Sequence, residues 1–215
     1  MIPTCRCSQR RVIRNTARPD RPGQRYRVSQ LGPPLDRVDR NRYVDAILAD
    51  RLAKDAYYRT SPDSPFRGAV NRPDALSYFE VDPGYRIVLA RIRPASANDQ
   101  PIELDTSDGN RRLARRRGFL DFMLDGQRLT LTGLGMGSTP HHSIFVPFQD
   151  LTSGRETYGG GRYLDLEPEP DGSVVLDFNL AHHPYCAYSG AYSCPLTPSQ
   201  NWLPVPIHAG ERQPS

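Results

Sequence analysis

Lysine is almost absent from this chain of 215 residues. Of its 28 basic residues, Lys54 is the only lysine and all the others are arginine, a ratio typical of a GC-rich genome. Positive charge is also scarce beyond the N-terminal segment. Residues 1–42 hold 11 arginines and three aspartates, a net charge of +8, whereas residues 43–215 hold 17 basic and 21 acidic residues, a net charge of −4. A nucleic-acid-binding domain carries positive charge on a folded face, so we expect no specific nucleic-acid partner.

Cysteine and long apolar runs are scarce as well. Four cysteines in a chain of this length do not make a disulfide framework. No segment approaches 18 consecutive apolar residues, so the sequence predicts no membrane partner. The N-terminus lacks the apolar run of a secretory signal. We therefore expect a cytoplasmic protein, and the sequence leaves its oligomeric state open.

The first 38 residues are predicted to be a disordered, arginine-rich leader, and residues 39–212 a single β-rich domain. The leader has no hydrophobic periodicity and few large apolar side chains, so it buries too little surface to offset its ordering entropy. Three interpretations compete for it: an arm that contacts nucleic acid or membrane headgroups, an organelle-type targeting peptide, or the product of a misplaced start codon. We prefer the last.

The periodicity of the chain predicts one helix followed by strands. Val44, Ile47, Leu48 and Leu52 fall on one face of a helix between residue 39 and about residue 58. The period then falls to two, and three Asp-Gly pairs, at 108–109, 125–126 and 171–172, are typical of tight hairpin turns. We expect a mainly β fold, an antiparallel β-sandwich or partly open barrel with one N-terminal helix. The predicted strands are 76–81, 85–92, 102–106, 111–115, 119–124, 129–134, 144–148, 163–166 and 174–179.

Several ordered motifs resemble a known family. They are Phe145–Gly154, Glu156–Tyr163, Asp177–Asn179, Pro184–Tyr188, Cys194–Leu196 and Ala209–Glu211, with weaker matches at Arg59–Pro62 and Tyr78–Pro83. Together they resemble the domain of unknown function 1684 family of bacteria and archaea, over about residues 40–212. The resemblance implies no activity. One departure is that His182-His183 stands where members usually carry Tyr-Asn, which weakens a metal site built on these histidines.

The segment most suggestive of a binding site runs from Thr152 to Tyr163. Its three glycines allow a ligand to approach the backbone closely, and the arginine after them has a donor geometry suited to carboxylate or phosphate. A phosphate loop is excluded because no Gly-Lys-Ser/Thr ending follows. The alternative is a structural corner in which Arg162 pairs internally with Glu156 or Asp177. The candidate ligand-binding residues are Thr152, Glu156, Tyr158, Gly159, Gly160, Gly161, Arg162, Asp177 and Asn179.

The cysteines and histidines suggest no cofactor. Cys186 and Cys194 are eight residues apart, a spacing that fits no standard zinc motif. We favour a disulfide or a packed thiol pair, and we predict no metal and no cofactor. His141 and His142 follow a flexible glycine-rich stretch and are expected to be solvated.

Three hypotheses for function remain open. The first is that the domain binds a small anionic or polar ligand at the glycine-rich Arg162 loop. The second is a hydrolase-type enzyme that uses Glu156 or Asp177 as general base. The third is a structural or interaction module with no small-molecule site.

Overall fold

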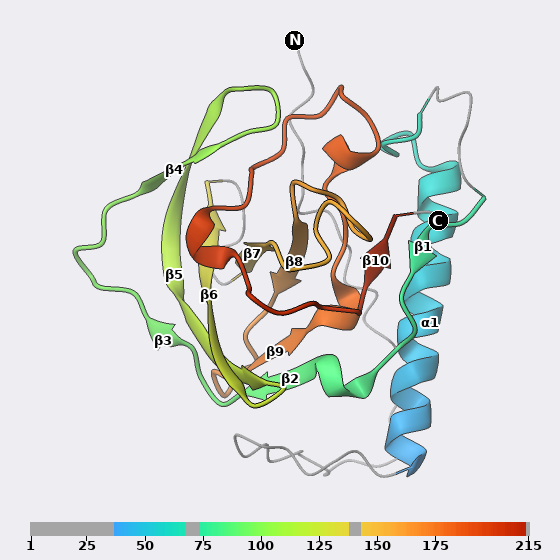
Figure 1. The fold of residues 1–215 in the computed structure, drawn as a ribbon, viewed down its shortest axis with the longest axis horizontal. Coiled ribbons are helices and arrows are strands. Elements are labelled where there is room, and N and C mark those ends of the chain that lie inside the picture. Colours follow the sequence, from blue (N-terminus) through green and yellow to red (C-terminus); the bar gives the residue numbers. More distant parts are fainter. Residues whose placement is uncertain (1–36, 68–73, 138–142, 214–215) are drawn as a thin grey trace.

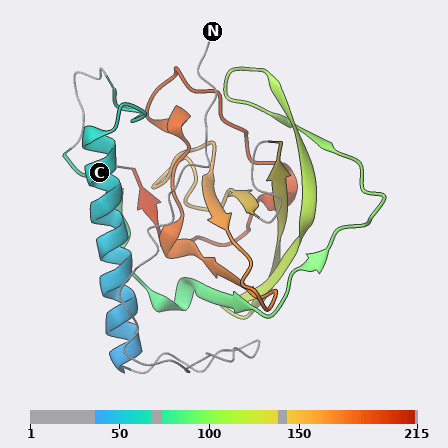
Figure 2. The same ribbon diagram turned by 180° about the vertical axis from the view of Figure 1, so that it is seen from behind.

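The computed structural model describes residues 37–67, 74–137 and 143–213, so the predicted leader and His141-His142 lie outside the described residues. A long helix, α1 (Arg37–Thr60), stands along one side of a β-rich body (Figure 1, Figure 2). Within the described residues the fold is mainly β, with antiparallel sheets that do not close into a barrel and one N-terminal α-helix. The predicted fold class is therefore confirmed. No helix in the described part of the chain combines the length and the apolar character needed to cross a membrane.

The largest sheet has six antiparallel strands, with β3, β5, β6, β7 and β8 in that order and β4 paired to β5. A tight turn at Asp125-Gly126 joins the two longest strands, and its positive φ angles of 48° and 75° confirm one predicted hairpin. The strands predicted at 111–115 and 119–124 are one strand, because a bulge between Arg116 and Gly118 absorbs the change of register. The strands are β3 (Arg93–Pro94), β4 (Ile102–Asp105), β5 (Arg111–Leu124), β6 (Gln127–Met136), β7 (Ile144–Phe148) and β8 (Arg162–Leu166).

Two short antiparallel ribbons complete the β structure. One pairs β2 (Arg86–Leu89) with β9 (Val174–Asp177), and the other pairs β1 (Ser77–Tyr78) with β10 (Glu211–Arg212). The strand predicted to reach Asn179 ends at Asp177, because the Asp177 side chain accepts the Asn179 N–H and starts a 3₁₀ turn. The 3₁₀ turns are Pro83–Tyr85, Phe178–Leu180, Tyr185–Ala187 and Ser199–Asn201.

The main hydrophobic core lies between the inner face of the large sheet and the β2–β9 ribbon. Alternation along the strands turns every second side chain inward, as the sequence pattern predicts. Phe178 anchors this core, with its ring 5.3 Å from the Phe148 ring and 5.8 Å from the Phe122 ring. The most deeply buried members include Leu120, Leu131, Val146, Phe148, Leu164, Leu176, Phe178 and Ile207.

Helix α1 buries only part of the face that the sequence predicts. Ile47 is buried, but Leu48 and Leu52 are 45% and 69% exposed, so the prediction that these two leucines face the core is wrong. The other buried residues of the helix are Arg51, Asp55 and Tyr58. Arg51 donates to the Phe79 carbonyl at 2.8 Å, and Asp55 accepts the Leu76 N–H at 3.1 Å. Polar contacts of this kind leave no hydrophobic period in the sequence, so the apolar pattern identified only part of the buried face.

Candidate functional site

The glycine-rich segment is a buried corner built around an ion pair. Arg162, the first residue of β8, has no exposed surface, and its guanidinium donates to Asp150 at 2.8 Å. It also donates to the backbone carbonyls of Ile207, at 2.8 Å, and Ala209. The internal partner is therefore Asp150, and neither Glu156 nor Asp177 as the sequence suggested. In this structure the guanidinium is not accessible to a ligand from solvent.

The same ion pair organises the start of the corner. Asp150 accepts hydrogen bonds from the Thr152 backbone N–H at 2.8 Å and from its hydroxyl at 2.6 Å. The Thr152 hydroxyl also lies 3.0 Å from that of Thr157, and both threonines are buried. Thr152 thus holds the turn together.

The three glycines differ in how much space surrounds their Cα atoms. Gly161 has a φ of +94°, and a Cβ there would lie 2.5 Å from the Phe148 carbonyl oxygen and 2.4 Å from the Thr197 hydroxyl. A Cβ on Gly160 would lie 2.5 Å from the Tyr158 ring, whereas one on Gly159 would make ordinary contacts only. Close packing of the corner explains two of the glycines.

The other two candidate residues of the loop point in different directions. Glu156 is exposed and pairs with His208, 3.2 Å from Nε2 to Oε1. Tyr158 is half-buried; its backbone N–H donates to His183 Nε2 at 3.2 Å and its hydroxyl lies 3.9 Å from the Cys186 sulfur. These side chains do not converge on a common cavity with Asp177 and Asn179, the two remaining candidates.

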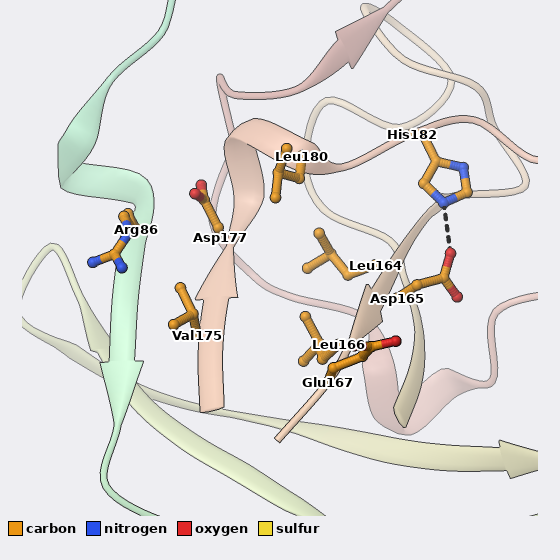
Figure 3. Close-up of a pocket in the computed structure, with 9 residues that line it drawn as sticks. All are labelled: Arg86, Leu164, Asp165, Leu166, Glu167, Val175, Asp177, Leu180 and His182. Atoms are coloured by element: carbon orange, nitrogen blue, oxygen red, sulfur yellow. Dashed lines mark hydrogen bonds and ion pairs between the residues drawn. The ribbon is translucent and has the colours of Figure 1, made fainter. Parts of the chain in front are cut away.

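A groove of about 290 Å³ lies between the edge of β8 and the neighbouring strand β9 (Figure 3). β8 ends the six-stranded sheet and β9 pairs with β2. The chain that follows β9 is bridged to β8 at Tyr163 and His182, whose backbones exchange hydrogen bonds of 2.8 and 3.0 Å. His182 is also among the residues that line the groove. Its lining residues are Arg86, Leu164, Asp165, Leu166, Glu167, Val175, Asp177, Leu180 and His182.

Asp177 stands at one side of the groove and is held in place. Tyr43 of α1 donates to both of its carboxylate oxygens, at 2.9 and 3.0 Å, and Asn179 donates through its backbone N–H and its side-chain amide. Asn179 is fixed in turn by Asp82, whose N–H and C=O it also binds. Burial raises the pKa of the Asp177 carboxyl, although the bonds from Asn179 and Tyr43 and the charge of Arg86 act in the opposite direction.

Arg86 is the positively charged residue on the same side of the groove as Asp177. It lies directly opposite Asp177 in the β2–β9 register, and its guanidinium carbon lies 5.9 Å from the centre of the Tyr43 ring. Its guanidinium donates no hydrogen bond to any described residue, although its charge lies near enough to Asp177 to lower the pKa of that carboxyl. Figure 3 shows it on the far side of Asp177 and Val175 from the histidine.

A histidine–aspartate pair forms the opposite rim. His182 Nε2 lies 3.1 Å from Asp165 Oδ2, and His182 Nδ1 lies 3.2 Å from the His183 carbonyl. Both ring nitrogens therefore lie within hydrogen-bond distance of oxygen atoms. The side chains of Leu164, Leu166 and Leu180 lie between this pair and Asp177 (Figure 3).

A second polar cluster is buried between α1 and β10. Glu211 is 1% exposed; Lys54 pairs with its carboxylate, which also accepts from the His183 backbone N–H at 2.7 Å and from the Tyr188 hydroxyl at 2.6 Å. Burial alone would raise the pKa of Glu211, but the charge of Lys54 and its hydrogen bond lower it to about 2. This cluster fastens helix α1 to β10.

His183 belongs to this buried cluster and is neutral. Its Nε2 accepts the Tyr158 N–H, which leaves the proton on Nδ1, 3.8 Å from Glu211. Burial lowers the pKa of His183 to about 4 and outweighs the opposing charge of Glu211. Among the residues that the structure describes, no three His, Cys, Asp or Glu side chains gather as a metal site.

Of the nine sequence-predicted site residues, Asp177 lines the groove and Asn179 supports it, whereas the other seven build the corner. Sequence reasoning missed Arg86 and Tyr43 altogether. Arg86 meets Asp177 through a strand register that joins residues far apart in the chain, and no local pattern carries that signal. Tyr43 lies on a helix face that the apolar period did not indicate.

The chain is 36% identical to an uncharacterised protein of Haloarcula marismortui whose solution structure was determined by NMR. That match covers 81% of this chain and 96% of the other, with a TM-score of 0.60. No curated protein matched the chain. Residues 73–212 match the model of the family described as protein of unknown function (DUF1684), and the chain therefore belongs to this family.

Proposed function

We propose that the protein binds a small, partly apolar ligand carrying a carboxylate or phosphate group, in the groove between β8 and β9. The observation that supports this most is Arg86, a guanidinium in a groove with no hydrogen bond to any described side chain or carbonyl. A guanidinium binds carboxylate and phosphate with two parallel hydrogen bonds. This proposal moves the anion site from the Arg162 loop to Arg86.

The rest of the groove fits an amphipathic ligand. Leu164, Leu166, Val175 and Leu180 supply an apolar surface, and Asp165 and Glu167 are exposed at the rim. These two carboxylates are acceptors for hydroxyl or amine groups on the same ligand. The volume equals that of about ten water molecules, at the lower end of the range for ligand pockets, so the proposal concerns a small metabolite.

A thermal-shift screen with paired arginine variants tests the proposal. The probes are mono- and dicarboxylates, amino acids and inorganic phosphate. We expect a ligand that raises the Tm of the wild-type protein to bind Arg86→Gln about 10- to 100-fold more weakly, since a hydrogen bond to a charged group contributes about 1.5–3 kcal/mol.

Arg155→Gln is the matched control, because Arg155 is an exposed arginine of the glycine-rich segment. It should bind the ligand as the wild type does. Loss of binding in Arg155→Gln with full binding in Arg86→Gln would overturn the proposal and return the site to the glycine-rich loop. The unliganded Tm of each variant shows whether the fold is retained.

A further inference from the structure

Two cysteine side chains meet where the loop of residues 186–194 begins and ends. The backbone N–H of Cys186 donates to the Cys194 sulfur, 3.4 Å away, and both residues are thiols in this structure. Cys186 follows the first residue of the 3₁₀ turn Tyr185–Ala187 and is half-buried, whereas Cys194 is completely buried. The groove proposed above makes no use of either.

The surroundings hold both ends of this loop in place. Cys194 is fixed by Ser107, whose backbone N–H donates to the Cys194 carbonyl at 2.8 Å and whose hydroxyl accepts the Cys194 N–H at 3.0 Å. The rings of Tyr185 and Tyr192, next to the two cysteines, contact edge to face with centroids 5.1 Å apart. The loop is therefore closed by non-covalent contacts before any bond joins the sulfurs.

We propose that Cys186 and Cys194 are a site of reversible oxidation that closes residues 186–194 with an intramolecular disulfide. The Cys194 sulfur already lies within hydrogen-bond distance of the Cys186 backbone, so the bond forms with little movement of the backbone. The oxidant is a small disulfide such as oxidised glutathione.

The exchange proceeds in two balanced steps. The Cys186 thiolate, on the more exposed residue, attacks one sulfur of oxidised glutathione, which gives a mixed disulfide and releases one glutathione. Cys194 then attacks the Cys186 sulfur and releases the second glutathione. The two cysteines lose two electrons and two protons, and the oxidant becomes two thiols.

Two conditions govern the rate and the direction of the reaction. The hydrogen bond from the neighbouring thiol and burial both raise the pKa of Cys186. Little thiolate is present near neutral pH, so oxidation is slow there and accelerates at alkaline pH. In a reducing compartment, such as the cytoplasm that the sequence predicts, the pair stays as thiols.

Peptide mass analysis of the oxidised full-length chain tests the proposal. After incubation with oxidised glutathione, alkylation and trypsin digestion without reduction, Cys186 and Cys194 fall in one peptide, residues 163–212, separate from the peptides that hold Cys5 and Cys7. We expect this peptide to lose two hydrogens and to take up no alkylating agent. Dithiothreitol should restore both thiols.

The melting temperature provides the second readout. A disulfide that closes a loop of this length should raise the Tm by about 5–10 °C, and Cys194→Ser should show no rise under the same treatment. The proposal fails if the peptide keeps both thiols, if it retains a glutathione adduct on Cys186, or if the oxidised protein melts no higher than the reduced one.

Discussion

Replacement of His183 by asparagine should make the protein less sensitive to acid. Asparagine is a smaller polar residue that does not titrate. In the wild-type protein, burial lowers the His183 pKa from 6.5 to about 4. The unfolded chain therefore takes up a proton at a higher pH than the folded one, and stability is lost as the pH falls from about 6.5 to 4.

The size of the effect follows from the shift. Each pKa unit corresponds to about 1.4 kcal/mol, so the wild type should lose about 2 kcal/mol between pH 7.5 and 5 through this histidine. The pKa of Glu211 is lowered to about 2, and its contribution is lost mainly below pH 4.5. A pH range of 7.5 to 5 therefore separates the contribution of His183 from that of Glu211.

Urea unfolding followed by far-UV circular dichroism measures this loss at each pH. His183→Asn should lose about 2 kcal/mol less than the wild type over the range, whatever its stability at pH 7.5. His208→Asn is the matched control, because His208 is half-exposed and pairs with Glu156 at the surface; its profile should follow the wild type. Equal losses in the wild type and His183→Asn would refute the idea that a buried neutral histidine controls acid stability.

Two substitutions test the structural interpretation of the glycine-rich corner. Asp150→Asn removes the charged partner of the buried Arg162 and should lower the free energy of unfolding by about 3–5 kcal/mol, measured by urea titration; a loss below about 1 kcal/mol would contradict this role. Gly161→Ala should destabilise the protein by several kcal/mol, whereas Gly159→Ala should be tolerated, because only the first places a Cβ against backbone at a positive φ. Equal Tm values for the two alanine variants would be inconsistent with this explanation.

The parts of the fold that follow local rules could be predicted from the sequence. Alternating strands and the Asp125-Gly126 turn gave the β5–β6 hairpin, because both depend on neighbouring residues. The two-residue strands β3 and β10 were missed, since neither is long enough to show a period. The helix face was only partly right, since Ile47 is buried but polar groups such as Arg51 make the other contacts of α1.

The candidate site could be predicted only in part, because its residues come together through tertiary packing. Asp177 and Asn179 were recognised as polar residues of a strand end, and both contribute to the groove side. Arg162 has the donor geometry of an anion site, but the same geometry serves a buried pair with Asp150 equally well. Which arginine faces solvent depends on tertiary packing, and the register that places Arg86 opposite Asp177 joins strands with most of the sheet between them in sequence.

Amide chemical-shift mapping tests the groove most directly. The ¹⁵N-labelled protein is titrated with the carboxylate that gives the largest thermal shift. We predict that the perturbed amides cluster on residues 164–167 and 175–177 and near Arg86, and that Arg86→Gln abolishes these changes. Perturbations confined to residues 152–162, and unchanged in Arg86→Gln, would contradict the account.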